Sequence, residues 1–407
     1  MKHYSQNRAL ISACVLSLIA TAGWSQRLTW LGTAGYTASM AYGVSADGSV
    51  VVGVASTSGR GGTTRAFRWT RATGMQELVT FPAIATSISA DGSVVIGWFY
   101  DSASNHRAFR WTATGGTEDL GTLTGGRQSW AYGVSANGSV IVGVSTNAGG
   151  YDRAVRWTQL GIQNLGTISG GSSYAYGVSP DGSIVVGQTD SRPFLWTRSS
   201  GMQTLPLPEG HNSGVAYGVS ANGSIVVGKV VVPPHPGGGF TTHIPCKWVN
   251  GVPTILRPVN SNWQGEAYAV SADGSVIVGT ITTSQGNLAC RWTESGGLEI
   301  LSQTYARLLG PDSRLEEARA ISPDGRFIVG WGFNENTWRT EAFLLDTRCT
   351  PHNGDINRDG CVDDRDLLTV LFEFGETGIF DGVDINCDRV IDDADLLVVL
   401  FNFGQGC

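Results

Sequence analysis

The chain has 407 residues, of which only 15% are charged, and a formal net charge of -7 at pH 7. This composition argues against a nucleic-acid partner, because binding a phosphate backbone requires a basic face. The 56 glycines indicate many tight turns, and the length is too great for one small domain.

The first residues, 1–22, have the pattern of an export signal. A basic start is followed by an apolar run, Ala9 to Ala22, which is too short to span a membrane as a stable helix. Ala20-Thr21-Ala22 fits a small-residue cleavage site, and cleavage after Ser25 is the alternative. We therefore expect a secreted, extracellular protein of bacterial-type export that is not inserted in a membrane after cleavage; a retained anchor is the other interpretation.

One pattern, Ala41-Tyr42-Gly43-Val44-Ser45-Ala46-Asp47-Gly48-Ser49, organises the chain. It recurs, strictly or loosely, from Ala85, Ala131, Ala175, Ala216, Ala267 and Ala318. Asp-Gly or Asn-Gly between two β-prone runs predicts a tight hairpin. A third run such as Arg65 to Thr70 and a fourth such as Met75 to Leu78 follow. Four short antiparallel strands repeated radially predict a mainly β fold, a seven-bladed β-propeller over residues 27–346.

The seventh copy lacks its fourth run, since the chain passes from Leu345 almost directly to Cys349. The missing piece lies at the other end, where Leu28 to Thr33 resembles Asp119-Leu120-Gly121-Thr122 of another copy. We expect this N-terminal strand to complete the last blade, which closes the ring and pairs an otherwise open strand edge. A parallel β-solenoid is the alternative, and it explains the missing strand less well.

Residues shared by the copies are interpreted as architecture, because a catalytic group is not needed seven times. Function is expected where the copies differ, in the second-to-third strand loops and the links between blades, which emerge on one face of the disc. Aromatic side chains there could stack on sugar rings, or could simply pack inward. No catalytic set is recognisable. The ligand-face candidates are Trp98, Tyr100, Trp130, Trp263, Trp331 and Trp338.

The repeat resembles the HAF family of probable extracellular repeats, over roughly residues 27 to 346. The matching residues are the tripeptides that begin at Arg65 and Arg107 and, more loosely, at Glu341, together with the Gly-Val-Ser-x-Asp-Gly-Ser strand pair. The resemblance implies an exported repeat protein and no known chemistry. Arg or Glu stands here where the family usually has His.

Two twelve-residue stretches of the tail, beginning at Asp355 and Asp384, place oxygen-bearing side chains at positions 1, 3, 5, 9 and 12. This spacing wraps hard oxygen ligands around one Ca²⁺, with a backbone carbonyl from position 7. Each stretch is followed by an apolar run that predicts a helix. Because there are two such stretches, we expect two bound Ca²⁺ ions. The candidate ligands are Asp355, Asn357, Asp359, Cys361, Asp363 and Asp366 in the first loop, and Asp384, Asn386, Asp388, Val390, Asp392 and Asp395 in the second.

The two loop–helix units (paired F-hands), without entering helices and each ending in Asp, resemble a type I dockerin over residues 355 to 404. The resemblance implies a small all-α domain, 355–407, after a linker, 347–354, and a calcium-dependent cohesin partner. Loop positions 10 and 11 would recognise that partner, and here they are Asp364, Arg365, Asp393 and Ala394. The Ser-Thr pairs of cellulosomal dockerins are absent, so a cell-surface or self-encoded receptor is the other expected partner.

The cysteines fall into two groups. Cys246 and Cys290 occupy the third-strand Phe column and are expected to be buried apolar residues. The four tail cysteines suggest two disulfides in an exported protein, and three pairings are possible. We favour Cys349–Cys407 with Cys361–Cys387.

The sequence thus predicts a secreted binding or display protein. Its propeller would bind a glycan or protein ligand, and its tail would attach it to a cohesin-type partner or a cell-surface assembly. The alternative is a polysaccharide-degrading enzyme tethered by the same tail, which hydrolyses O-glycosyl bonds at the variable face of the propeller.

Overall fold

The computed structural model describes residues 26–57, 62–232, 241–256, 263–284, 286–348, 353–357, 359–376, 383–386 and 390–407. These residues form two compact units, one within 26–348 and one in the tail after residue 352. The predicted export signal lies outside the described residues. Among the helices that are described, none has the length and apolar character needed to cross a bilayer.

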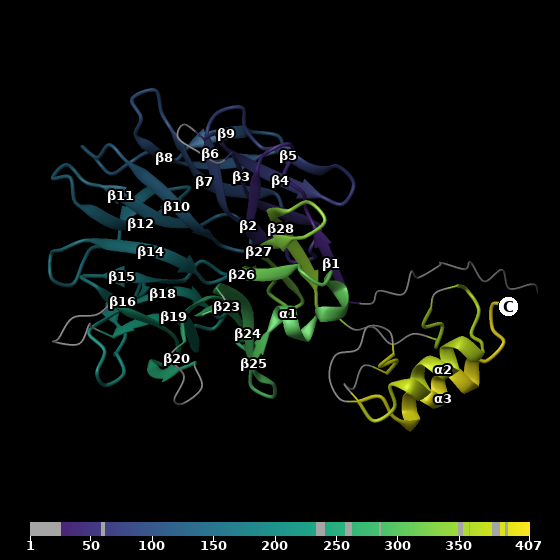
Figure 1. Cartoon of the computed structure of the whole chain (residues 1–407). Coiled ribbons are helices and arrows are strands. Elements are labelled where there is room, and N and C mark those ends of the chain that lie inside the picture. Colours follow the sequence, from purple (N-terminus) through teal and green to yellow (C-terminus); the bar gives the residue numbers. More distant parts are fainter. Residues whose placement is uncertain are drawn as a thin grey trace, which may run out of the picture. The chain divides into compact units, whose positions relative to one another are not determined.

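The larger unit is a seven-bladed β-propeller, built from seven four-stranded antiparallel sheets (Figure 1). In six sheets the strands follow one another in chain order. Blade 1 contains β2 (Ala38–Val44), β3 (Val50–Ser56), β4 (Thr64–Thr70) and β5 (Gly74–Glu77). Blade 2 contains β6 (Ala83–Ile88), β7 (Val94–Tyr100), β8 (His106–Thr112) and β9 (Gly116–Asp119). Blade 3 contains β10 (Ser129–Val134), β11 (Ile141–Thr146), β12 (Asp152–Thr158) and β13 (Gly161–Asn164).

The next three blades repeat this meander. Blade 4 contains β14 (Ser173–Val178), β15 (Ile184–Thr189), β16 (Arg192–Thr197) and β17 (Gly201–Thr204). Blade 5 contains β18 (Ser213–Val219), β19 (Ile225–Val232), β20 (Thr242–Val249) and β21 (Val252–Ile255). Blade 6 contains β22 (Gln264–Val270), β23 (Val276–Thr283), β24 (Gly286–Thr293) and β25 (Gly297–Ile300). The link to blade 7 holds a short helix, α1 (Leu301–Thr304), and a 3-10 turn, η1 (Ala306–Leu308). The repeat pattern did not predict these two elements.

Blade 7 combines the two ends of the propeller sequence. It contains β26 (Arg314–Ile321), β27 (Phe327–Asn334), β28 (Arg339–Asp346) and, as its fourth strand, β1 (Arg27–Trp30). In the pairing of β1 with β28, Trp30 lies opposite Phe343 and their rings meet edge to face at 6.4 Å. Just after β1, Leu31 donates its backbone N–H to the carbonyl of Ala342.

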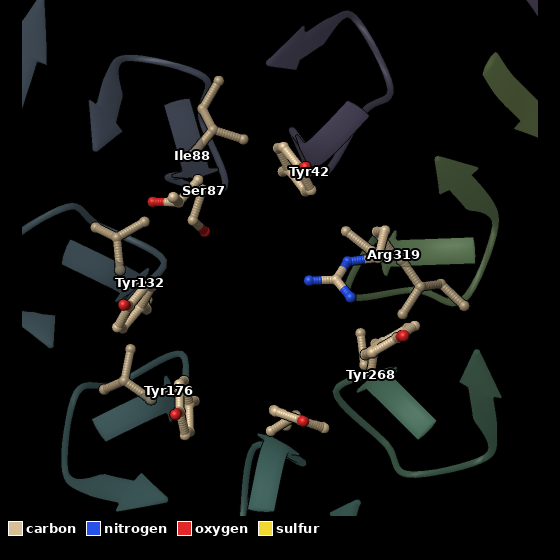
Figure 2. Close-up of a pocket in the computed structure, with 18 of the residues that line it drawn as sticks. Tyr42, Ser87, Ile88, Tyr132, Tyr176, Tyr268 and Arg319 are labelled. Carbon is tan, nitrogen blue, oxygen red and sulfur yellow. The ribbon is translucent and has the colours of Figure 1, made fainter. Parts of the chain in front are cut away.

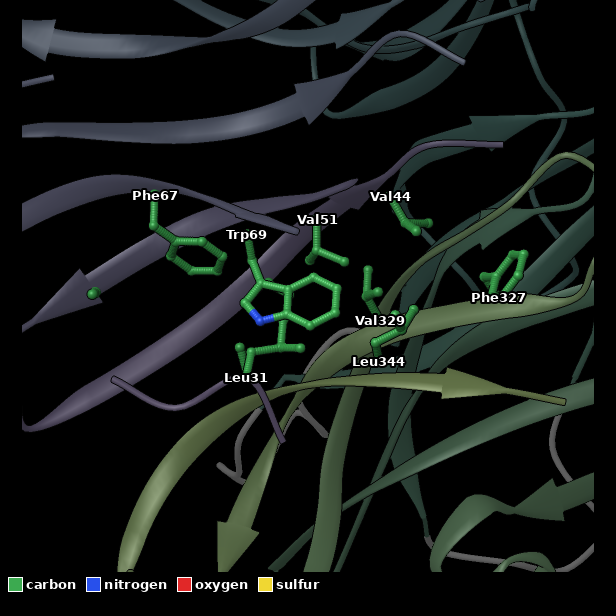
Figure 3. Packing of buried hydrophobic residues seen from close by; sticks show 11 residues of the cluster. Leu31, Val44, Val51, Phe67, Trp69, Phe327, Val329 and Leu344 are labelled. Carbon is green, nitrogen blue, oxygen red and sulfur yellow. The ribbon is translucent and has the colours of Figure 1, made fainter. Parts of the chain in front are cut away.

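The first strands of the blades contact one another in a closed circuit, from β2 through β6, β10, β14, β18 and β22 to β26 and back to β2. The core lies between successive blades. Where blade 7 meets blade 1, Trp69 and Leu31 pack with Val329 and Leu344 of the last blade (Figure 3). The tryptophans near the ends of the third strands (the Trp column), such as Trp69, Trp157 and Trp248, are mostly buried. Cys246 and Cys290 are buried free thiols in the Phe column of the same strands, as expected.

The repeated turns have one hydrogen-bond network. The N–H of Gly48 donates to the carbonyl of Ser45, and the φ of +68° at Gly48 is the left-handed conformation that Gly adopts without strain. The Asp47 carboxylate accepts from the Ser45 hydroxyl and from the N–H of Ser49. Each copy has the corresponding Ser–Asp or Ser–Asn bond. The architectural interpretation of these Asp and Asn residues is therefore confirmed.

The described tail contains two helices in contact, α2 (Asp364–Phe372) and α3 (Asp393–Asn402). Each begins with a capping box, formed by Asp363 with Asp366 and by Asp392 with Asp395.

The favoured disulfide pairing was wrong, because the structure joins Cys361 to Cys407 with Cα atoms 4.7 Å apart. The segment after α3 returns to the first loop, where Val362 N–H donates to Gln405 and Gly404 N–H donates to Val362. This return brings Cys407 beside Cys361. Cys349 and Cys387 lie outside the described residues.

Candidate functional site

Antiparallel order gives the propeller two distinct faces. The second-to-third strand loops and the links between blades emerge on one face, which we call the variable face. The turns between the first and second strands, and between the third and fourth strands, emerge on the other face, which we call the uniform face. Each first strand therefore runs from the variable face toward the uniform face.

A β-bulge interrupts the first strand pair of every blade at the same place, as between Ala41 and Gly43 of β2. A bulge leaves one residue unpaired and re-aims its side chain. The residue in each bulge lines a central cavity (Figure 2). These residues, which we call the channel ring, are Tyr42, Thr86, Tyr132, Tyr176, Tyr217, Tyr268 and Arg319.

The sequence around each bulge explains its geometry. Ala41 is fully buried, and Gly53 of β3 lies opposite it. A Cβ added to Gly53 would overlap the carbonyl oxygen of Met40, so only glycine allows the two strands to approach this closely. The equivalent glycines of the other six blades meet a carbonyl oxygen in the same way. The repeated Gly in the second strand thus makes room for the bulge that points the next side chain into the channel.

The cavity has a volume of about 530 Å³, which falls within the usual range for small-molecule sites. Beyond the channel ring, on the side of the uniform face, it is lined by a collar of aliphatic side chains. The collar consists of Val44, Ile88, Val134, Val178, Val219, Val270 and Ile321. The cavity therefore has a phenolic and cationic level next to an apolar level.

Backbone hydrogen bonds between neighbouring blades run around the channel at the uniform face. Ala46 N–H donates to the carbonyl of Ala90, Ala90 N–H to Ala136, and Ala136 N–H to Pro180, each at 2.8–2.9 Å. Pro180 has no N–H to continue the series to blade 5. Two further bonds link Ala221 to Ala272 and Ala272 to Pro323. These bonds hold the collar end of the channel together.

Arg319 gives the channel ring its one charge. Its guanidinium carbon lies 3.9 Å from the centroid of the Tyr268 ring, a close cation–π contact. A carboxylate oxygen of Glu317 is 3.8 Å from its Nη1. Burial raises the pKa of Glu317, while the charge of Arg319 lowers it, and the net direction is upward. Burial also raises the pKa of Tyr132 to about 12, so its phenol stays protonated at neutral pH.

A second group of charges lies beside the channel ring in blades 5 and 6. Glu266 Oε1 is 2.8 Å from Lys229 Nζ and 3.3 Å from His243 Nδ1. Lys229 Nζ also lies 5.9 Å from the centroid of Tyr217. Glu266 precedes Tyr268 by two residues in β22, just as Glu317 precedes Arg319 in β26. The two carboxylates thus occupy equivalent positions on the variable-face side of neighbouring blades.

Three of the six ligand-face candidates gather around His106 at the variable face, in blades 2 and 3. The His106 ring centroid lies 4.8 Å from that of Trp98, 4.6 Å from Tyr100 and 4.9 Å from Trp130. We call these four residues the mouth cluster. His106 Nδ1 is hydrogen-bonded to the side chain of Gln128 at 2.9 Å, and Tyr100 is 43% exposed. His106 was not predicted as a site residue, although it opens the third strand at the position where the repeat meets its variable loop.

The other three candidates do not join this cluster. Trp331 lies beside the channel ring, edge to face with Tyr42 at 5.8 Å. Trp263 packs against the core between blades 5 and 6, as expected if the aromatic side chains pack inward. Trp338 is 76% exposed, has a left-handed φ of 55° and touches Phe333.

The two candidate calcium loops share one hydrogen-bond pattern. Asp366, at position 12, is fully buried and accepts from the backbone N–H groups of Ile356, Asn357 and Asp363. Asp395 accepts from the equivalent residues of the second loop. The last Asp of each loop therefore ties the start of the loop to its helix. Asp388 lies outside the described residues.

One atom of the first loop is an unsatisfied acceptor. Asp355 Oδ1 is buried and has no hydrogen-bond partner, while its Oδ2 accepts from Gly360 N–H. A bound cation would satisfy such an oxygen, so the residues of this loop fit Ca²⁺. Among the described residues, no three His, Cys, Asp or Glu side chains alone are grouped as a metal site. The expected set also draws on Asn side chains and backbone carbonyls.

The candidate partner residues Asp364, Arg365, Asp393 and Ala394 are exposed in the first turns of α2 and α3. Farther along each helix and just after its end, apolar side chains at matching positions are also exposed. The matched pairs are Leu368 and Leu397, Leu371 and Leu400, Phe372 and Phe401, and Phe374 and Phe403. Phe372 and Phe401 are 85% and 81% exposed. The tail thus has two exposed sets of apolar side chains, one in each loop–helix unit.

No family model matches the chain, and no curated protein matches it. Among solved structures it is similar to TolB from Acinetobacter baumannii, with 14% identity, a TM-score of 0.41, and coverage of 75% of this chain and 82% of that one. It is also similar to a chain of the mitotic checkpoint complex, with 13% identity, a TM-score of 0.45, and coverage of 84% and 96%. Likenesses this remote say nothing about a ligand or partner.

The channel ring was not predicted as a site. Its column was treated as architecture, yet it changes from Tyr to Thr86 and Arg319 while its neighbours stay small. That chemical variation at one repeat position was the available signal. The repeated Gly of the second strand is a sequence mark of a bulge, but which side chain the bulge turns into the channel follows only from the pairing of the strands.

Proposed function

We propose that the protein is an exported binding or display protein whose variable face holds a glycan and whose tail, loaded with Ca²⁺, attaches it to a protein partner. The observation that carries the first part is the mouth cluster. Half-buried aromatic rings, with the exposed Tyr100 among them, offer faces on which a sugar ring can stack. His106 and Gln128 supply polar atoms next to these faces.

A glycan array on the intact chain tests the mouth cluster. Trp130→Ala should remove or strongly weaken glycan binding, because it takes away one stacking face. Trp338→Ala is the matched control, since Trp338 is exposed but lies outside the cluster. Equal loss from both variants, or no binding to any glycan, would contradict the proposal for this face.

For the tail, the residues that would hold Ca²⁺ are those named in the two loops. The ion would neutralise their clustered carboxylates and fix the loops at the starts of α2 and α3. The partner would be a cohesin-like module or a cell-surface receptor that covers the exposed residues of α2 and α3. The doubled apolar surface supports this, because exposed apolar patches mark interaction sites.

Calorimetry of the intact chain with purified cohesin-like modules, with and without chelator, tests the attachment. Phe372→Ser together with Phe401→Ser should abolish binding, whereas Leu160→Ser, at a 93% exposed position of the propeller, should not. Calcium-independent binding would contradict the proposed role of the ion.

The alternative, a tethered glycoside hydrolase, rests on Glu266 and Glu317. Glu266 forms an ion pair with Lys229, while burial raises the pKa of Glu317. Glycoside hydrolysis uses a pair of carboxyl groups, of which the general acid has a raised pKa. Release of reducing sugar by the wild-type chain, and its loss in Glu317→Gln, would favour this alternative over simple binding.

A further inference from the structure

Arg319 stands where five of the other copies of the repeat have Tyr and one has Thr86. Its bulge in β26 aims the side chain into the channel, and Figure 2 shows the guanidinium group pointing toward the centre of the ring. The Arg319 side chain is 32% exposed, although it lies inside the propeller. Among the residues that line the central cavity, Arg319 thus supplies the one cationic side chain.

The protein groups around Arg319 balance its charge only in part. Glu317 is 3.8 Å away, which is beyond hydrogen-bond distance, and Glu266 is held by Lys229 and His243. The other neighbours are the rings of Tyr268, Tyr42 and Trp331, and the side chain of Tyr268 also shares a hydrogen bond with Arg319. A guanidinium group has five N–H donors in a fixed fork, which matches the two oxygens of a carboxylate. The surroundings therefore suit a small anion from outside the chain.

The shape of the cavity restricts that anion further. The aliphatic collar lies next to the guanidinium level, so an inorganic anion would leave the apolar half of the cavity unfilled. A cation would be repelled by Arg319. We propose that the channel binds a small monocarboxylate whose apolar body, alkyl or aryl, lies within the collar while its carboxylate meets Arg319. Trp98 of the mouth cluster also lines the cavity, but Arg319 and the collar belong to neither the mouth cluster nor the tail loops, so this carboxylate site goes beyond the proposed function.

Calorimetric titration of the intact chain with short alkanoates and phenylalkanoates, each beside its uncharged amide, tests the proposal. We expect saturable binding of one acid per chain, tighter than the matched amide by about tenfold or more, because only the acid forms a charge-assisted bidentate pair. Affinity should rise with the apolar body until the collar is filled. The alkyl and aryl series decide which body fits. Equal affinity of acid and amide, or no saturable binding by any probe, would overturn the proposal.

Variants at two arginines of β26 locate the site. Arg319→Tyr restores the residue of five other copies and should weaken the acid by about tenfold or more while leaving the amide nearly unchanged. Arg314→Gln is the control, because Arg314 is half exposed and pairs with Glu316 on the same strand. Thermal unfolding checks that both variants fold. If Arg319→Tyr does not fold, Arg319→Lys, which keeps the charge but loses the fork, should still weaken the acid selectively. Retained acid preference in the folded variant would overturn the assignment.

A variant of the collar provides a second, independent readout. Val134→Phe fills part of the apolar level, so it should weaken the longer acids more than the shortest one. Trp130→Ala, which tests the mouth cluster, should leave acid binding unchanged, since Trp130 does not line the cavity. Failure of glycan binding and failure of acid binding are thereby distinguishable. Loss of all acids alike in Val134→Phe would contradict the placement of the apolar body.

Discussion

The hydroxyl of Ser89 donates a 2.6 Å hydrogen bond to the carboxylate of Asp91, and the N–H and hydroxyl of Ser93 donate to the same carboxylate. These bonds lower the pKa of Asp91 below its usual value of 3.8. Asp181 and Asp273 accept hydrogen bonds from the equivalent serines of their own blades, and their pKa values are lowered in the same way. Copies with Asn137 and Asn222 hold the turn without an ionisable group.

This arrangement predicts that the stability of the propeller falls at acid pH. Because the folded-state pKa is lowered, each carboxylate stabilises the fold fully above its unfolded-state pKa, and the contribution is lost as the pH falls through the lower folded value. The triple variant Asp91→Asn, Asp181→Asn, Asp273→Asn should fold and lose less stability than wild type between neutral pH and about pH 3. Urea unfolding at several pH values measures this. Asn137→Asp should have the opposite effect; identical pH profiles would contradict the prediction.

The seventh blade predicts a long-range effect of the N-terminal strand. Leu31 is 5% exposed and packs in the core between blades 7 and 1. Leu31→Ala should therefore lower the free energy of unfolding by about 2–5 kcal/mol. Leu160→Ala, at 93% exposure, should change it by less than about 0.5 kcal/mol. Removal of residues 28–33 should be more damaging still, since it also opens the edge of β28. Unchanged unfolding of that truncation would mean that the ring does not need the strand.

Calcium should bind the tail and order it. The eight acidic side chains among the candidate ligands of the two loops repel one another without a cation. Calorimetry of the intact chain should give two Ca²⁺ ions, and a chain ending at Arg348 should give none. Asp355→Ala should remove the first site, because its buried Oδ1 has no other partner. Calcium binding that survives loss of the tail would place the ion elsewhere.

The two calcium sites should differ in affinity. The first loop has Gly360 at position 6, with a φ of +90°. The second has Arg389 there, which lies outside the described residues. A left-handed conformation costs a non-Gly residue roughly 1–2 kcal/mol, so the second site should bind about tenfold more weakly. Arg389→Gly should tighten it and leave the first site unchanged. Two equal sites in the wild-type titration would show that the loop accepts Arg without strain.

The sequence by itself determined the repeated parts of the molecule. Seven copies of a two-strand pattern around Asp-Gly or Asn-Gly required seven β-hairpins, because the positive φ of residues such as Gly48 and the Asp47 network depend only on neighbouring residues. The buried Trp and Phe columns followed from the same periodicity. The spacing of Asp355 to Asp366 likewise indicated a loop–helix unit, and α2 begins within it.

Only the tertiary structure decided what the repeats enclose. Tyr42 and Arg319 face one cavity because a bulge in each first strand turns one side chain out of the alternation, and because seven strands distant in sequence meet at the axis. The same holds for the ring contacts of His106 with Trp98 and Trp130, and for the disulfide between Cys361 and Cys407. Both depend on segments that the fold brings together in space. Local sequence fixes backbone conformation through neighbouring residues, whereas these contacts arise from the packing of whole blades and from the path of the chain end.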